Sequence, residues 1–448
     1  MGGALVASTL DGNRLAQSTG LSARRVAAVS IGTTLEIYDF CTFAYFAIQI
    51  GRSFFPQSWT SHGLLFSLAS FGIGFITRPL GGIVIGRYGD RVGRTSAMLW
   101  SFGLMGAAIL GLALTPSYAQ IGIAAPILLV NFRLVQGFAL GGEVGPSVAY
   151  LIESAPPHRR GLYVGMLIAT YSVATLIAGL VGFILAASLQ PAQLDDWGWR
   201  IAFVIGAAVV PVGLYIRRSL PDTLHGSDEC VGPPARRRIP PRFIALSLMM
   251  VLAGTISNYV VDYMTTYAQD TLKLAASVAF GATIVTGVCF PIAATIGGAI
   301  SDRVGRKPVM SCGFGLMLVL TVPLFMAMTE MPSRSVVYGS IAMLSGSQAL
   351  IASMVMLGIS ESLPLASRSG AFGIIYAVGA AVFGGSTQFV IKGLNDLTGS
   401  PLAPAWYLTG ALVIGGAAML AMRESAPCKI IAGPTRSAGD RAITDGIN

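Results

Sequence analysis

Charged residues are scarce in this chain of 448 residues: they make up 11% of the sequence, whereas hydrophobic residues make up 54%. Soluble domains carry about 25% charged residues, so this composition excludes an ordinary water-soluble protein. Apolar runs of about 20 residues, the length that crosses roughly 30 Å of hydrocarbon, recur along the chain. They predict twelve transmembrane helices, at about 26–50, 62–85, 96–115, 121–151, 161–187, 199–217, 243–268, 277–300, 309–329, 336–360, 371–394 and 405–422.

Histidine and cysteine are also few, and their positions exclude the common kinds of catalytic and metal chemistry. His158 and His225 fall in predicted loops and His62 at the boundary between a loop and a predicted helix, and the five cysteines lack the spacing of a metal site or a disulfide framework. No nucleophile elbow, zinc-protease motif or phosphate-binding loop precedes a suitable helix. We therefore expect no enzyme activity, no metal and no cofactor.

The net charge of +9 does not indicate a nucleic-acid partner once the positions of the 29 basic residues are considered. With both termini placed in the cytoplasm, most of these residues fall in the tails and the cytoplasmic loops, which is the positive-inside pattern. Residues 1–25 have no apolar segment before a cleavage site, so they are expected to be a cytoplasmic tail. We expect a multi-pass protein of a bacterial inner membrane that contacts the lipid bilayer and functions as a monomer.

Two motifs occur twice and predict that the chain consists of two related halves. D-R-x-G-R begins at Asp90 and again at Asp302, and E-S-x-P-x-x-x-R begins at Glu153 and again at Glu361. Internal repeats of this kind are typical of secondary transporters. The predicted organisation is a tail at 1–25, a six-helix bundle at 26–217, a cytoplasmic linker at 218–242, a second six-helix bundle at 243–422 and a tail at 423–448.

The two halves are expected to enclose a cavity between them. The acids and bases of these motifs are expected to pair at the cytoplasmic face, where they form a gate that closes this face when the cavity opens to the outside. The alternative is that the loop arginines only enforce the orientation, which would not explain the accompanying acids. The predicted gate residues are Asp90, Arg91, Arg94, Glu153, Arg160, Asp302, Arg303, Arg306, Glu361 and Arg368.

The repeated loop resembles the signature G-x-x-x-D-R-x-G-R-R/K of the major facilitator superfamily, although Thr95 replaces the last base of the first copy. Four further motifs resemble the metabolite:proton symporter family, which includes citrate, tricarballylate, α-ketoglutarate, shikimate and proline/betaine carriers. They are F-x-x-R-P-x-G at 75–81, R-L-x-Q-G at 133–137, G-G-E at 141–143 and W-G-W-R at 197–200. The resemblance implies an all-α fold, with twelve transmembrane helices in two pseudo-symmetric six-helix bundles and transport by alternating access.

Polar side chains at membrane depth are costly, so they are expected to face the interior of the bundle. Arg133 and Gln136 share one face of the fourth predicted helix, where a guanidinium can hold a carboxylate through two donors. Arg78 is expected either to bind a substrate carboxylate or to hold Asp39 and Glu36 in place. The predicted substrate-binding residues are Tyr38, Arg78, Arg133, Gln136, Asn258, Tyr259, Gln348 and Gln388.

The coupled proton is expected on a carboxylate, because no histidine lies in the interior of a predicted helix. The candidates are Glu36, Asp39, Glu143 and Asp262. Asp39 is the first candidate, since it is nearest the midplane and can approach Arg78, and Glu36 on the same helical face is the next. A fixed ion pair with a neighbouring arginine is the alternative for both. Asp262 is left open between coupling, substrate selection and a position at the outer rim.

The buried bases argue against drug efflux by proton antiport, because pockets for lipophilic cations need acids and aromatic residues instead. We therefore expect proton-coupled uptake of a small organic acid, with di- and tricarboxylates such as citrate first. Proton symport of a zwitterionic osmolyte of the proline/betaine type is the alternative, with efflux as a further rival. The expected partners are the organic anion and the proton, with no nucleic acid.

Overall fold

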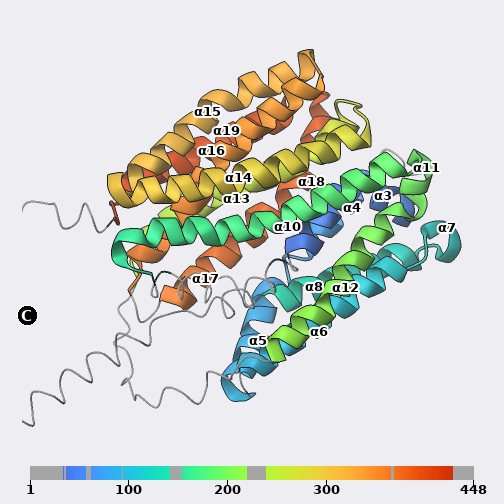
Figure 1. Ribbon diagram of the computed structural model, residues 1–448, viewed down its shortest axis with the longest axis horizontal. Coiled ribbons are helices and arrows are strands. Elements are labelled where there is room, and N and C mark those ends of the chain that lie inside the picture. The colour runs from blue at the N-terminus through green and yellow to red at the C-terminus, as the bar shows by residue number, and fades with distance from the viewer. Residues whose placement is uncertain are drawn as a thin grey trace, which may run out of the picture.

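The structure is a computed structural model, and it describes residues 34, 37–56, 62–92, 94–141, 152, 155–218, 239–364 and 368–426. These residues form helices and connecting turns, with no strand among them. The long helices lie side by side in one elongated bundle (Figure 1). Eight of the described helices are long and apolar enough to cross a membrane, and two shorter apolar helices span Leu99–Leu114 and Ala124–Leu140.

The first half of the chain begins with a helical stretch at 37–45, called here the first helical segment. It is followed by α3 (Ala47–Phe54), α4 (Gly63–Ile73), α5 (Arg78–Val92), α6 (Arg94–Leu114), α7 (Tyr118–Ile121), α8 (Ala124–Leu140), η2 (Pro157–Arg159), α10 (Arg160–Ser188), α11 (Pro191–Gln193), η3 (Leu194–Gly198) and α12 (Trp199–Arg218).

The second half contains α13 (Pro241–Asp270), α14 (Ala276–Val304), α15 (Arg306–Glu330), α16 (Arg334–Ser362), α17 (Arg368–Gly379), η6 (Ala380–Gly384), α18 (Gly385–Thr398) and α19 (Ala403–Ala421). Every predicted transmembrane helix therefore has a helical counterpart, which confirms the all-α, twelve-helix prediction. The proposed domain boundaries stay a prediction, since most of the linker lies outside the described residues.

Two of the predicted helices are interrupted. In the second, the amides of Phe75, Ile76 and Arg78 each donate to the carbonyl three residues earlier, which forms a tight turn at 74–77 between α4 and α5. Pro79, which has no amide hydrogen, follows directly and cannot continue the regular bonding pattern. In the eleventh, the π-helical turn η6 separates α17 from α18.

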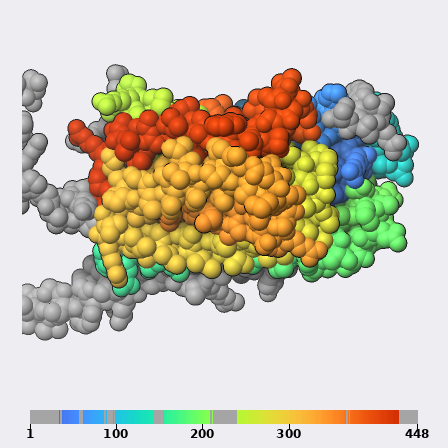
Figure 2. All heavy atoms as spheres, turned by 90° about the horizontal axis from the view of Figure 1, so that it is seen from above, coloured from blue at the N-terminus to red at the C-terminus, as the bar shows by residue number. Residues whose placement is uncertain are grey.

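The two halves meet along two pairs of helices. α10 packs along α14, and a Cβ atom on Gly161 or Gly298 would collide with the backbone of the other helix. α4 packs against α18, where Gly72 touches the backbone of Gly385. Small residues allow helix backbones in membranes to approach closely, so these glycines set the distance between the halves. Figure 2 shows the second half, in yellow to red, covering one long face of the bundle.

The two ends of the bundle are named by the helices that meet there. The motif end is the end where α14 finishes and α15 begins, and it contains the second D-R-x-G-R motif, residues 302–306. The far end is the opposite one, where α13 finishes and α14 begins. α10 runs from the motif end to the far end beside α14 (Figure 1).

Candidate functional site

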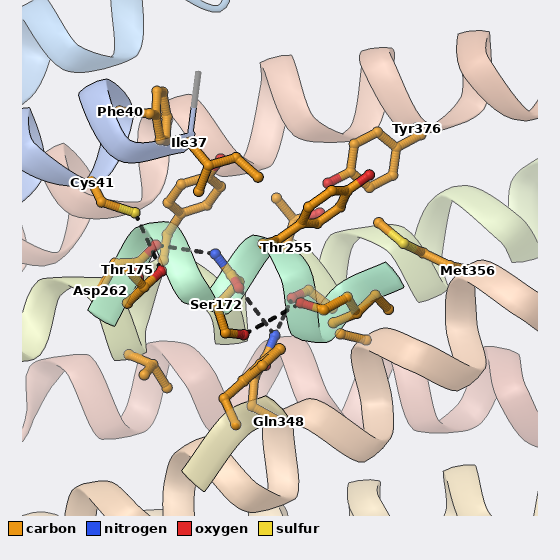
Figure 3. A pocket seen from close by; sticks show the side chains of 18 of the residues that line it. Ile37, Phe40, Cys41, Ser172, Thr175, Thr255, Asp262, Gln348, Met356 and Tyr376 are labelled. Atoms are coloured by element: carbon orange, nitrogen blue, oxygen red, sulfur yellow. Dashed lines mark hydrogen bonds between the residues drawn. The ribbon is translucent and has the colours of Figure 1, made fainter. Parts of the chain in front are cut away.

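A cavity of about 220 Å³ lies between the two halves. The first helical segment, α5, α8 and α10 supply one part of its wall, and α13, α14, α16 and α17 supply the other. In the close view, side chains from both halves point toward the same space (Figure 3). The volume is below the roughly 300–1,000 Å³ of pockets for drug-sized ligands, so the cavity suits a small metabolite.

Three hydrogen-bonded side chains line this cavity. Gln348 Nε2 on α16 donates to Asn258 Oδ1 on α13 over 3.4 Å, and Asn258 Nδ2 donates to Asp262 Oδ2 over 3.1 Å (Figure 3). Asn258 and Asp262 are four residues apart on α13, so one helical turn places them on the same face. A carboxyl group therefore stands at the end of a short chain of amides.

Arg78 brings a guanidinium to the cavity wall from the first turn of α5. Its Cζ atom lies 3.8 Å from the ring centroid of Phe75 and 4.9 Å from that of Phe40. Aromatic faces attract a guanidinium and hold its plane in place. The turn at 74–77 is itself fixed by α8, because a Cβ atom on Gly137 would collide with the carbonyl of Gly74.

Asp39 and Arg133 form a buried ion pair beside the cavity. Arg133 Nη1 lies 3.6 Å from Asp39 Oδ2, and the two side chains are 3% and 2% exposed. The Arg133 guanidinium also covers the Phe43 ring, with its Cζ atom 3.5 Å from the centroid. The sequence predicts that Asp39 can approach Arg78, but the ion pair of Asp39 is with Arg133 from α8. Neither member of the pair is among the described residues that line the cavity.

Several buried polar atoms around this pair have no hydrogen-bond partner among the described residues. They are Asp39 Oδ1, Arg133 Nε and Nη2, and both amide atoms of Gln136. Leaving such an atom unsatisfied costs about 1–3 kcal/mol, and more for a charged group. Donors and acceptors placed together in this way can therefore gain free energy by binding a polar ligand.

An aromatic cluster of Phe40, Phe71, Phe75 and Tyr259 connects the two halves next to the cavity. The Tyr259 ring on α13 lies 5.8, 5.9 and 5.7 Å from the centroids of Phe40, Phe71 and Phe75, each time in an edge-to-face arrangement. Pairs with this geometry contribute about 0.5–1.5 kcal/mol beyond their buried area. The cluster therefore holds the halves together at this level through contacts between aromatic rings.

A charge cluster ties the two halves together at the motif end. Arg306 Nη1 lies 2.7 Å from Asp302 Oδ1, and Arg306 Nε lies 3.2 Å from Glu361 Oε2. The Asp302 carboxylate also accepts the backbone amides of Gly161 (2.8 Å) and Leu162 (2.9 Å), at the start of α10 in the other half. A carboxylate at a helix N-terminus satisfies unpaired amides and interacts favourably with the helix dipole.

The remaining predicted gate residues occupy different positions. Arg160 donates to the carbonyl of Ile152, and Arg368 donates to that of Leu363. Arg303 is exposed and forms no ion pair with the described residues, so it does not join the charge cluster. The side chains of Asp90, Arg91, Arg94 and Glu153 lie outside the described part of the structure.

The predicted substrate and proton residues also divide into groups. Arg78, Asn258, Tyr259, Asp262 and Gln348 line the cavity. Tyr38 and Gln388 do not line it. The Tyr38 hydroxyl donates to the carbonyl of Ala202. Gln388 is fully buried, and its amide has no hydrogen-bond partner among the described residues. Glu36 and Glu143 lie outside the described residues.

Several small polar residues of the cavity wall were not predicted from the sequence. Cys41 Sγ lies 3.6 Å from Thr175 Oγ1, and Ser172 is one helical turn away from Thr175 on α10 (Figure 3). Tyr376 on α17 also lines the cavity. The three-residue spacing of Ser172 and Thr175 on a largely apolar helix is the signal that could have identified this face.

Comparisons with known proteins agree with this architecture. The family model described as the Major Facilitator Superfamily matches residues 40–385. A citrate-proton symporter of Salmonella typhi is 34% identical over 405 residues, which are 89% of this chain and 93% of that protein. The alpha-ketoglutarate permease of Escherichia coli (strain K12) is 31% identical over 413 residues, 91% and 95% of the two chains.

The solved structures give the same picture of the fold. The xylose transporter XylE from E. coli, in a partially occluded inward open conformation, is similar with a TM-score of 0.71. That similarity covers 88% of this chain and 98% of XylE at 17% sequence identity. At this level of identity, it bears on the fold alone.

Proposed function

Because the chain belongs to the major facilitator superfamily, we propose that it is a proton-coupled symporter for a small organic acid, with di- and tricarboxylates such as citrate first. The observation that carries this proposal is the similarity to a citrate-proton symporter over nearly the full length of both chains. The superfamily consists of transporters, and the two contacting halves with a cavity between them suit alternating access.

The charges around the cavity support an anionic substrate. Arg78 faces the cavity, and Arg133 is held beside it with two nitrogen atoms unpartnered among the described residues. A guanidinium can bind a carboxylate through two parallel hydrogen bonds, and a second guanidinium can take a second carboxylate. We propose that Arg78 and Arg133 bind the substrate, with Gln136, Asn258 and Gln348 supplying neutral hydrogen bonds.

The ion pair of Asp39 and Arg133 suggests how a proton could be coupled to the anion. Protonation of Asp39 removes the charge that holds Arg133, which frees the guanidinium for a substrate carboxylate. Binding of that carboxylate must in turn change the proton affinity of Asp39, because linkage between two ligands is reciprocal. We propose Asp39 as the first coupling residue, with Glu36 and Glu143 as the other candidates of the first half.

The finer statements on location and assembly belong to the same proposal. Both termini are proposed to lie in the cytoplasm of a bacterial cell, because the basic residues concentrate in the tails and in the loops of that side. The motif end would then face the cytoplasm. One chain supplies every described wall of the cavity, so we propose that a monomer transports.

Transport by the purified full-length chain in lipid vesicles tests the proposal. An inwardly directed proton gradient should drive accumulation of labelled citrate, and a protonophore should abolish it. Arg78→Ala should lower the uptake strongly, since it removes the cation of the cavity wall. Arg52→Ala is the matched control, because Arg52 is 62% exposed and pairs with Asp195 at the surface.

Two outcomes would count against this substrate class. Accumulation of proline or betaine without any uptake of citrate or α-ketoglutarate would favour the zwitterion alternative. Equal uptake by the Arg78→Ala and Arg52→Ala proteins would remove Arg78 from the binding site.

A further inference from the structure

The two described acids near the cavity have different surroundings. Asp39 forms an ion pair with Arg133 and lies outside the cavity wall. Asp262 lines the cavity, and no lysine, arginine or histidine among the described residues forms an ion pair with it. Its hydrogen-bond donors are the neutral amide of Asn258 and the neutral phenol of Tyr45. An ionised carboxyl group removed from bulk water without a cation is costly, so this position favours the uncharged form.

The other elements packed around Asp262 do not supply the missing positive charge. Cys41 and Tyr45 of the first helical segment interact with it, and neither is a cation. α10 contributes Thr175, α14 contributes Thr286, and α16 contributes Gln348 through Asn258. Arg78 is the cation of the cavity wall. Its guanidinium and the Asp262 carboxyl each interact electrostatically with Tyr259. Arg78 is stacked on Phe75 and Phe40 of the first half.

We propose that Asp262 binds a proton inside the cavity and that this proton is required for the substrate anion to bind there. The proposal rests on the proposed function, and it adds a second proton site to the one suggested at Asp39. An ionised Asp262 would repel a substrate carboxylate strongly, since the cavity is largely apolar and screens charge poorly. A protonated Asp262 removes that repulsion and offers an O–H donor to the anion.

The hydrogen-bonded chain fits this role. Gln348 donates to the Asn258 carbonyl oxygen, which fixes the orientation of the amide so that its nitrogen faces Asp262 Oδ2. One carboxyl oxygen is then engaged as an acceptor in both protonation states, and the proton is carried by the other. A divalent cation fits less well, because the described residues contain no group of three or more His, Cys, Asp or Glu side chains that could hold a metal.

Infrared spectroscopy of the purified full-length protein in lipid, without substrate, tests the protonation directly. A protonated carboxyl group has a C=O stretching band that disappears as the group ionises. Because Asp39 can contribute a band of its own, the decisive comparison is made in the Asp39→Asn background. Between about pH 5.5 and about pH 8, we expect a band that weakens as the pH rises in Asp39→Asn and that is absent in the double variant Asp39→Asn/Asp262→Asn. The same band in the double variant would overturn the proposal. This arm uses no substrate, so it can fail or succeed independently of the proposed transport function.

Binding of α-ketoglutarate, a dicarboxylate fully ionised over this range, tests the consequence. Wild-type affinity should fall by up to about tenfold per pH unit once Asp262 ionises, as expected for one linked proton. In Asp262→Asn, the affinity for α-ketoglutarate should depend less on pH, because the contribution of this one proton is missing. At the higher pH, this variant should bind α-ketoglutarate at least as well as the wild type does. Asp39→Asn is the control that keeps the Asp262 dependence. If α-ketoglutarate does not bind, the same comparison is made with betaine.

Binding of betaine that requires an ionised Asp262 and is lost in Asp262→Asn would overturn the proposal and make the residue a subsite for a substrate cation. An unchanged pH dependence of α-ketoglutarate binding in Asp262→Asn would overturn it as well.

Discussion

Replacement of Asp302 by asparagine should open the motif end of the transporter. The Asp302 carboxylate is the acceptor that joins α14 to the start of α10, through the amides of Gly161 (2.8 Å) and Leu162 (2.9 Å). It also pairs with Arg306 over 2.7 Å, and its side chain is 7% exposed. Asparagine keeps the shape of the side chain, but one oxygen becomes an amide that donates, so one of the two backbone amides loses its acceptor.

The size of the effect can be worked out from these contacts. A hydrogen bond to a charged group contributes about 1.5–3 kcal/mol, and the substitution removes one such bond and weakens the other. Arg306 keeps Glu361 as a partner at 3.2 Å, so no cation is left uncompensated. A loss of about 2–3 kcal/mol, at 1.4 kcal/mol per factor of ten, shifts the equilibrium toward separated halves at the motif end by about 30- to 150-fold.

Alkylation of Cys41 can report this shift, because this residue is 4% exposed and lies in the cavity wall. With the other four cysteines replaced, an impermeant maleimide added from the motif end should label Cys41 faster in Asp302→Asn than in the parent. Asp396→Asn is the control, since Asp396 pairs with Lys392 within the second half at 2.6 Å. Equal labelling rates in the parent, Asp302→Asn and Asp396→Asn would refute the gate.

Three further predictions concern the binding site and the packing of the halves. In a thermal-shift or calorimetric assay, Arg133→Lys should weaken substrate binding, because lysine keeps the charge but loses the planar pair of donors, and Arg133→Ala should nearly abolish it. Equal affinities of the wild type and the two variants would make Arg133 a structural residue. Asp39→Asn should lower the accumulation that a proton gradient can drive and preserve substrate exchange in vesicles, because asparagine mimics the protonated acid and leaves Asp262 as the remaining proton site. An unchanged accumulation ratio would place the first proton elsewhere. Gly165→Ala should lower thermal stability by about 1–3 kcal/mol, since its Cβ atom would press on the backbone of Ala294. Gly103→Ala, which meets open space, is the control, and equal melting temperatures would contradict close backbone packing.

The fold was predictable from the sequence because a membrane helix is recognised locally, from the length and hydropathy of a single run. The cavity residues Arg78, Asn258 and Gln348 were predictable for a related reason: a large polar side chain at membrane depth has few favourable positions except the interior. Small hydroxyl side chains give a weaker signal, since they can form hydrogen bonds within their own helix. Ser172, for example, donates to the carbonyl of Ile168 on α10 over 3.3 Å.

Pairing between helices was harder to predict. Either Arg78 or Arg133 could reach Asp39, and the choice depends on how α5 and α8 are rotated about their axes. The turn at 74–77 and the position of α8 decide this, and both result from backbone contacts between glycines. For the same reason, the capping of α10 by Asp302 of the other half could not be predicted, because its partners are backbone amides, which every residue except proline carries.

The interruptions of the second and eleventh membrane helices have a mechanical consequence. The tight turn at 74–77 comes directly after α4, and the π turn at 380–384 comes directly before α18. Next to these turns, Gly72 of α4 touches Gly385 of α18. The two facing helices are therefore jointed at the same level. Short turns with altered hydrogen bonding inside long helices often mark hinges, and bending at these two turns would let α5 and α17 move apart while α4 and α18 remain in contact. A transporter built in this way needs only part of each helix to move in order to change the side from which its cavity is filled.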